Sequence, residues 1–182
     1  MNVRNTRGFS LLELIVVIIV LSIIAITAYA RYVDLRNETH IATNAALTRT
    51  YKAAIESAHL RWTIEGAPGR VQNLAVFGEN ILDLNSNGWP IGTNKGSAND
   101  NIGRQNQGCS SLWNYLLETG PRSATNTSED YQSYRHSSNL QCSFVLRTNG
   151  DTGNRNIAQL GVLYNSNNGD VSACGNLVGT SC

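Results

Sequence analysis

One carboxylate lies inside the most apolar stretch of the sequence. Glu13 stands between Leu12 and Leu14, and no further charge appears before Arg31. A charged side chain at the centre of a membrane helix costs about 2.5–3.5 kcal/mol on insertion scales, and less near the interface. Either this carboxylate reaches the lipid headgroups, or a positive partner compensates for its charge.

The second set of residues with reactive side chains is four cysteines in the C-terminal part: Cys109, Cys142, Cys174 and Cys182. Four cysteines allow three pairings, among which the sequence alone does not choose. A zinc site is the competing interpretation, but no C-x-x-C spacing exists, and His40, His59 and His136 are not grouped with the cysteines. Disulfides are therefore expected wherever this part of the chain meets an oxidising environment.

A third pattern fits the opening of a calcium-binding loop. Residues Asp83 to Gly88 read D-x-N-x-N-G, but Asn94 stands where the loop needs a bidentate glutamate. An ordinary Asn-Gly turn is the better interpretation, so we expect no metal. No nucleophile elbow, Walker loop, Ser-His-Asp order or paired carboxylates stand out either, so we expect no enzyme activity and no cofactor.

Composition limits the remaining classes. The 182 residues are 41% hydrophobic and 15% charged, with 14 Lys+Arg against 13 Asp+Glu. This is the bulk of about one domain, without the basic patch of a dedicated nucleic-acid binder.

The apolar stretch around Glu13 predicts a membrane segment. About 20 residues, from Phe9 to Ala30, would form a helix of roughly 30 Å, which matches a bilayer core. Arg4 and Arg7 precede it, which favours a cytoplasmic N-terminus. A cleaved secretory signal ending at residues 28–30 is the alternative, but such a signal has no use for Glu13.

Residues Gly8 to Leu14, behind the short basic leader of residues 1–7, read G-F-S-L-L-E-L. Here the chain resembles the type IV pilins and pseudopilins. The resemblance implies that a prepilin peptidase cuts between Gly8 and Phe9 and methylates the new amino group of Phe9. It also implies that Glu13 neutralises the amino terminus of a neighbouring subunit during filament assembly.

The helical pattern continues beyond the membrane segment. Neither proline nor glycine occurs from Phe9 through Glu65, so one helix of about 55 residues is expected. An apolar stripe that includes Tyr51, Ala53, Ile55 and Leu60 predicts that its second half packs on a sheet rather than in a coiled coil.

The remaining residues are rich in turn formers and predict a small antiparallel sheet. The expected elements are a turn over residues 85–92, a loop over 93–107, a serine-capped helix over 107–117, strands over 140–146 and 157–164, and a hairpin through 165–170 to 171–173. With the long helix, this is an α+β fold of the type IV pilin kind.

The C-terminal part is similar to the mannose-sensitive haemagglutinin (MSHA) pilins. The similarity rests on the order of short motifs: N-G-W-P at Asn87 to Pro90, a G-C-x-x-L-W helix, a cysteine-bearing strand and a closing hairpin. Type IV pilins often close their C-terminus with a disulfide. The resemblance therefore favours pairing Cys109 with Cys142 and Cys174 with Cys182.

The sequence is accordingly interpreted as a major or minor pilin, with a cleaved leader (1–8), a membrane and filament-core helix (9–30), its amphipathic continuation (31–64) and a disulfide-bonded head (65–182). Expected partners are other pilin subunits, prepilin peptidase, an inner-membrane assembly platform and, before assembly, membrane lipid; no nucleic acid is expected. The expected location is the bacterial inner membrane, with a cytoplasmic N-terminus, and then an extracellular pilus used in attachment. The alternatives are a pseudopilin of a type II secretion system and an uncleaved membrane-anchored binding or sensor domain.

Overall fold

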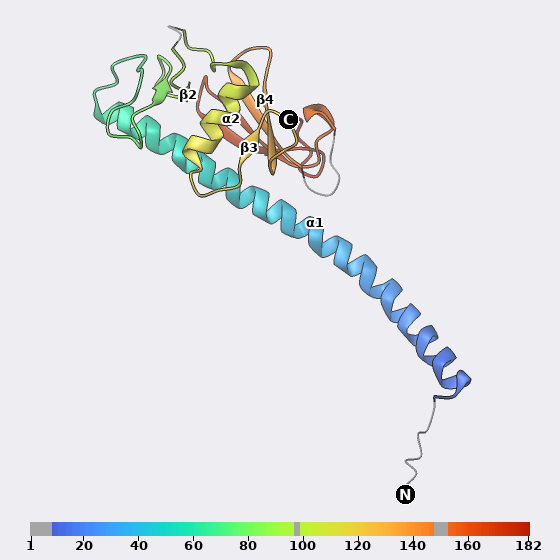
Figure 1. The fold of residues 1–182 in the computed structure, drawn as a ribbon. Coiled ribbons are helices and arrows are strands. Elements are labelled where there is room, and N and C mark those ends of the chain that lie inside the picture. Colours follow the sequence, from blue (N-terminus) through green and yellow to red (C-terminus); the bar gives the residue numbers. More distant parts are fainter. Residues whose placement is uncertain (1–8, 97–98, 148–152) are drawn as a thin grey trace, which may run out of the picture. The chain divides into compact units, whose positions relative to one another are not determined.

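The computed structural model describes residues 9–96, 99–147 and 153–182 (Figure 1). The chain divides into two compact units, Met1–His40 and Ile41–Cys182. One helix, α1 (Leu11–Ile64), runs through both of them. The elements after it are β1 (Leu82–Leu84), β2 (Pro90–Thr93), α2 (Gln105–Leu116), β3 (Ser123–Ala124), β4 (Tyr131–Arg135), β5 (Gln141–Leu146), the 3-10 helix η1 (Arg155–Ile157), β6 (Gly161–Asn165) and β7 (Asp170–Cys174).

The length of α1, 54 residues, confirms the single long helix predicted from the sequence. Nothing in the chain breaks it before Ile64, because the first glycine after this point is Gly66 and the first proline is Pro68. In the first unit, the aliphatic side chains of α1 are exposed on all sides, from Leu11 to Ile26.

The second part of α1 buries a single stripe of side chains: Asn44, Thr48, Tyr51, Ile55 and Ala58. The alternating spacing of four and three residues puts them on one face of the helix. The stripe predicted from the sequence was partly wrong, because Ala53 and Leu60 are exposed. Small and apolar residues occur on more than one face here, so periodicity alone could not select the buried one.

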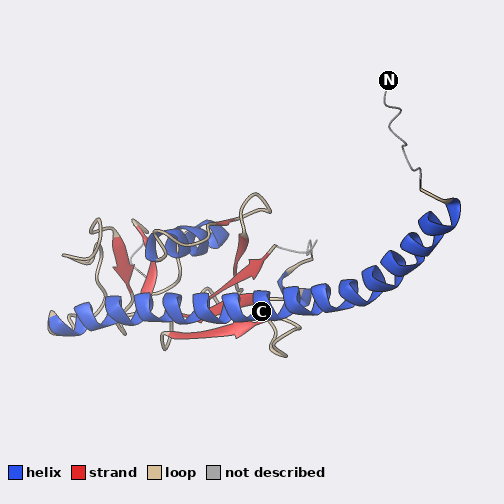
Figure 2. Ribbon diagram, turned by 90° about the horizontal axis from the view of Figure 1, so that it is seen from below, coloured by secondary structure: helices blue, strands red, loops and turns tan. Residues whose placement is uncertain are grey.

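Two sheets form the β part of the second unit. β1 and β2 pair antiparallel, and the five-stranded sheet has the order β3-β4-β5-β6-β7, with only the short β3–β4 pair parallel. The strands of this sheet run alongside the second part of α1 (Figure 2), and α2 packs against β2, β3 and β4. The predicted α+β fold is confirmed.

An aromatic cluster fills the core between the helices and the sheet. The ring of Tyr51 lies 5.0 Å from that of Trp113, 5.4 Å from that of Phe144 and 6.0 Å from that of Tyr164. All four residues are fully buried. Such ring pairs contribute about 0.5–1.5 kcal/mol each beyond their buried area, so this cluster helps to hold α1 against α2 and the sheet.

A polar contact next to this cluster explains why the buried stripe contains an asparagine. The side-chain amide of Asn44 donates to the carbonyl of Gly161 at 2.9 Å. The hydroxyl of Tyr131 donates to the side-chain carbonyl of Asn44 at 3.0 Å. Both ends of the buried amide are therefore paired, which removes the cost of burying it.

The helix predicted over residues 107–117 exists as α2, but its predicted serine cap is wrong. α2 follows Arg104, which has φ 50° and caps the helix with no side-chain bond. Ser110 and Ser111 lie inside the helix instead. The Ser110 hydroxyl donates to the carbonyl of Ser123 at 2.6 Å, so it ties α2 to β3.

Strand boundaries also differ from the prediction. Residues 140–146 and the closing hairpin are confirmed as β5 and β6–β7, but residues 157–160 do not extend β6. Asn154 starts η1 there, because its side chain accepts a bond from the amide of Asn156 at 2.9 Å. The strands β1, β2, β3 and β4 were not predicted. β1, β2 and β3 have only two to four residues each, and Pro90 placed the start of β2 within a predicted turn.

Candidate functional site

The start of α1 is built by Ser10 and Glu13. The amide and the hydroxyl of Ser10 each donate to Oε2 of Glu13 at 3.2 Å. In return, the amide of Glu13 donates to the Ser10 hydroxyl at 3.2 Å. This reciprocal pattern is a capping box, which satisfies amide groups that the first turn of a helix leaves free.

The capping box gives the carboxylate in the apolar stretch a partner within its own chain. Sequence reasoning considered only lipid headgroups or an external cation for Glu13. The S-x-x-E spacing before an apolar run was the available signal for this third partner. Within the described part of the chain, both bonds to the carboxylate use Oε2, so Oε1 can still accept from a cation.

Phe9 immediately precedes this cap and is 84% exposed. Gly8, the other residue of the expected cleavage site, and the expected leader of residues 1–8 lie outside the described residues. Phe9 and Glu13 are thus close in sequence at the exposed beginning of α1.

Behind the cap, α1 is long and apolar enough to cross a membrane. The side chains in this span, including Ile15, Ile19 and Ile23, are not covered by the rest of the described chain. An apolar surface of this extent must be covered by lipid tails or by other protein.

The four cysteines form two disulfides, Cys109–Cys142 and Cys174–Cys182. These are the two pairings that the resemblance favours. The first joins α2 to β5 inside the aromatic core, and the second joins the end of β7 to the last residue of the chain. All four sulfur-bearing residues are buried, so the bonds serve the architecture of the second unit.

In the calcium-like pattern, the side chains of Asp83 and Asn85 accept hydrogen bonds from backbone amides of this chain. The carboxylate of Asp83 accepts from the amides of Asn73 at 2.9 Å and Lys95 at 2.5 Å. The side-chain carbonyl of Asn85 accepts from the amides of Asn87 at 3.0 Å and Trp89 at 2.8 Å. Among the described residues, no group of three or more His, Cys, Asp or Glu side chains could hold a metal ion.

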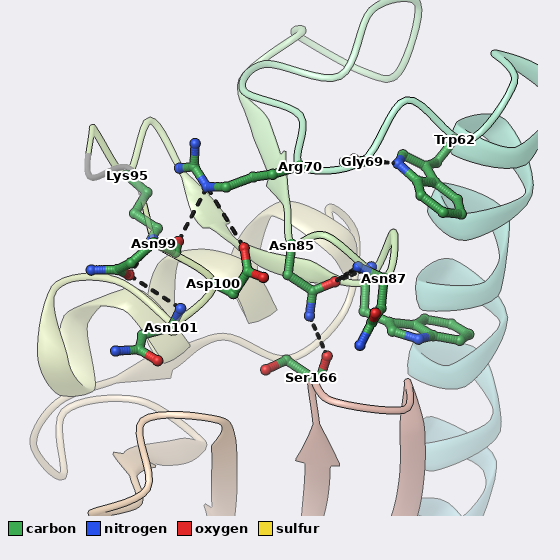
Figure 3. A network of polar contacts seen from close by, with 11 residues as sticks. Trp62, Gly69, Arg70, Asn85, Asn87, Lys95, Asn99, Asp100, Asn101 and Ser166 are labelled. Atoms are coloured by element: carbon green, nitrogen blue, oxygen red, sulfur yellow. Dashed lines mark hydrogen bonds and ion pairs between the residues drawn. The ribbon is translucent and has the colours of Figure 1, made fainter.

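Loops around this turn are joined by further polar contacts (Figure 3). The side chain of Arg70 donates to the carbonyl of Asn99 at 3.1 Å, and Lys95 reaches the same residue. Burial lowers the pKa of Lys95, and the nearby Arg70 lowers it further. Asn85 also donates to the carbonyl of Ser166 at 2.5 Å, which links this turn to the β6–β7 hairpin.

The structure brings one histidine to a serine, a pair that sequence order did not suggest. Nε2 of His136 lies 2.6 Å from the hydroxyl of Ser143. Ser143 is fully buried, so a substrate could not reach its hydroxyl. His59 instead stacks between the rings of Trp62 and Trp89, with centroid distances of 5.3 Å and 3.9 Å.

Comparison with known proteins finds one family. Residues 3–29 match the family model of the prokaryotic N-terminal methylation motif. No curated protein and no solved structure matches the chain. The match supports a type IV pilin-like or pseudopilin chain, whose motif family is structural rather than enzymatic and whose members are anchored in the membrane by an N-terminal apolar helix.

Proposed function

We propose that this chain is a structural subunit of a type IV filament of the MSHA kind, which is made as a membrane-anchored precursor and contributes to surface attachment. The observation that carries the proposal is the G-F-S-L-L-E motif directly ahead of an apolar helix that its own chain leaves uncovered. Such a helix needs lipid before assembly and neighbouring subunits afterwards.

The proposed maturation begins with hydrolysis of the peptide bond between Gly8 and Phe9 by a prepilin peptidase. Water supplies the second oxygen of the new Gly8 carboxylate, and Phe9 keeps the nitrogen as a new amine. This amine then takes a methyl group from a sulfonium methyl donor, which leaves as a thioether while the amine loses a proton. Gly8 suits this step because it places no side chain beside the scissile bond. Loss of Arg4 and Arg7 changes the formal charge of the chain from +1 to −1, since +1 − 2 = −1.

Glu13 then pairs with the Phe9 amine of a neighbouring subunit. The capping box supports this role, because among the described residues Ser10 bonds to Oε2 and leaves Oε1 able to accept. Bringing opposite charges together within an apolar filament core compensates for the burial of each, whereas either one alone is costly. The carboxylate thus disfavours the lone subunit in lipid and favours the assembled one.

In this proposal, residues 9–30 form the membrane and filament-core helix, residues 31–64 form its amphipathic continuation, and residues 65–182 form the disulfide-bonded head. The leader faces the cytoplasm in the inner membrane, and the head faces the opposite side. Partners are other pilin subunits, prepilin peptidase and an inner-membrane assembly platform.

A pseudopilin of a type II secretion system shares the same N-terminal features and is the alternative. Filaments sheared from the cell surface separate the two, because a secretion pseudopilus does not form long surface fibres. We expect the chain in sheared fibres with an N-terminal methylated Phe9, detected by mass spectrometry. An intact Met1 in the fibres would contradict the processing, and absence from the fibres would favour the pseudopilin.

A further inference from the structure

A cavity of about 600 Å³ lies between α1, α2 and the loop of residues 77–81, all within the second unit. Its apolar wall is formed by four half-buried side chains: Phe77, Ile81, Tyr115 and Leu116. Cavities of this volume with an apolar wall are typical of sites that hold a small organic molecule. Its residues have no part in the proposed filament role.

Tyr115 holds the loop of residues 77–81 against α2. Its hydroxyl donates to the carbonyl of Phe77 at 2.8 Å and accepts from the amide of Glu79 at 3.1 Å. Gly78 permits this close approach, because a Cβ there would lie 2.5 Å from the hydroxyl oxygen. Burial raises the pKa of Tyr115, so the hydroxyl keeps its proton, and with it the bond to Phe77, at neutral pH. The wall of the cavity is therefore in place before a ligand arrives.

Three exposed charged side chains line the same cavity: Glu79, Glu118 and Arg122. Both carboxylates lie near the hydroxyl of Tyr115, since each of them raises its pKa. Within the part of the chain that the structure describes, none of the three charged groups forms an ion pair. All three charges can therefore act on a molecule that enters the cavity.

This set of charges limits the chemistry of the ligand. An ammonium group can donate to the two carboxylates beside the Tyr115 ring, whose face also attracts a cation. A carboxylate can take two parallel bonds from the guanidinium of Arg122. Because Arg122 is not paired with either glutamate, the two signs of charge stand apart in the cavity, as they do in a zwitterion. A ligand with only one of these groups leaves part of the cavity unmatched.

We propose that this cavity binds a free α-amino acid with a large apolar side chain. Glu79 and Glu118 bind its ammonium group, and Arg122 binds its carboxylate. The side chain packs on Phe77 and Leu116. Binding is reversible, and no covalent bond forms or breaks.

The test uses L-phenylalanine and two analogues that each lack one charged group. Phenethylamine lacks the carboxylate, and 3-phenylpropanoate lacks the ammonium group. Each compound is titrated at about pH 7, where both groups are charged, into the full chain in micelles of a non-ionic detergent. The amide NMR signals of Gly78 and Leu116 report binding. We expect saturable shifts with L-phenylalanine and binding about tenfold or more weaker for each analogue, because each loses a charge-assisted set of hydrogen bonds.

Variants assign the two ends of the ligand to the two sides of the cavity. In the double variant Glu79→Gln with Glu118→Gln, L-phenylalanine should lose its advantage over 3-phenylpropanoate. In Arg122→Gln it should instead lose its advantage over phenethylamine. Glu129→Gln and Arg49→Gln remove exposed charges that do not line the cavity, so both advantages should persist.

The amide signals of the five-stranded sheet show whether each variant is folded, and Glu118→Gln alone replaces the double variant if that one is not. Three results would overturn the proposal: no saturable shift with L-phenylalanine, equal binding of the three compounds, or unchanged advantages in the variants of the cavity. Tighter binding of phenethylamine than of L-phenylalanine would also overturn it, since the cavity would then be a site for simple organic cations.

Discussion

From Leu11 to Ile26, α1 exposes large aliphatic side chains on every side, whereas from Ile41 to Ile64 it buries two polar residues, Asn44 and Thr48. The backbone conformation is the same in both stretches, so the difference lies in what covers the helix. The second stretch is covered by its own chain, which offers Gly161 and Tyr131 as partners for the Asn44 amide. The first stretch is left for lipid or for other subunits.

The comparison shows that the burial of a residue within its own chain does not measure its importance in this protein. The head is stabilised by contacts that the chain supplies itself, and changes there should appear as lost stability of the monomer. The apolar stretch is stabilised by molecules outside the chain. Changes there should therefore leave the head intact and appear in insertion or assembly.

The largest effect that separates the two regions is expected from Glu13→Leu. Removing the charge should leave membrane insertion intact or improve it, because a charged group in lipid is costly. Assembly should fail, because the amine of an incoming subunit would be buried without its partner. Glu38→Gln, which removes a carboxylate from the same helix outside the apolar stretch, is the control. Normal yield of sheared filaments from Glu13→Leu would contradict the proposed role.

Trp113→Ala should produce the largest loss of stability in the head. The indole is fully buried and contacts the rings of Tyr51, Tyr131 and Phe144. Its truncation should lower the free energy of unfolding by about 3–5 kcal/mol. Tyr29→Ala removes an exposed aromatic ring from the apolar part of α1 and should leave the thermal transition of the head unchanged. Equal shifts for both variants would show that the two regions unfold together.

The two disulfides should contribute unequally. On the loop-entropy model, the sequence separations of 33 and 8 residues give about 3.7 kcal/mol for Cys109–Cys142 and about 2.5 kcal/mol for Cys174–Cys182. Paired cysteine-to-alanine variants, unfolded with urea, would measure each contribution. The reverse order would mean that the native contacts of the loop closed by Cys174–Cys182 outweigh chain entropy.

Asn44→Ala should destabilise the head by about 1–3 kcal/mol, because the Tyr131 hydroxyl and the Gly161 carbonyl lose a buried partner. Thr43→Ala, an adjacent change on the exposed face, is the matched control and should have little effect. Urea unfolding of both variants measures the difference. A loss of similar size for Thr43→Ala would mean that helix propensity, and not the buried amide, is responsible.

The smallest effect is expected from Ser10→Ala, which removes half of the capping box. Loss of such a cap costs about 0.5–2 kcal/mol at the helix end. Amide hydrogen exchange in micelles should accelerate in the first turn of α1 and remain unchanged in the head. Ser10→Thr should preserve the wild-type rates, since threonine keeps the hydroxyl. Unchanged exchange in Ser10→Ala would show that the carboxylate does not depend on Ser10 for its position.

Sequence reasoning succeeded where the determining signal is local. The absence of proline and glycine set the length of α1, and the alternation of Gln141 to Leu146 predicted β5. It failed where several local patterns compete. The serines of α2 read as caps but bond to carbonyl groups, and Pro90 read as part of a turn but begins β2.

The candidate site also contains features that local sequence predicts and features that it does not. Glu13, Phe9 and the apolar run are adjacent in sequence, so their spacing alone predicts a membrane helix with a carboxylate near its beginning. The capping box is also local, and its S-x-x-E spacing was available but not used. By contrast, the contacts of His136 with Ser143 and Arg155 join residues from different elements, and no short pattern relates them.

The sequence by itself determined that α1 begins with an apolar stretch long enough to cross a membrane, and where the N-terminal methylation motif lies, because each depends on the chemistry of neighbouring residues and on helical geometry. Only the tertiary structure decided which face of α1 is buried, that Asn44 belongs to it, and that His136 meets Ser143 and Arg155. These features depend on the register of the sheet, which places Cys142 opposite both Arg135 and Tyr164. Contacts between distant strands leave no periodic trace in a single sequence, since each strand shows only its own alternation of faces.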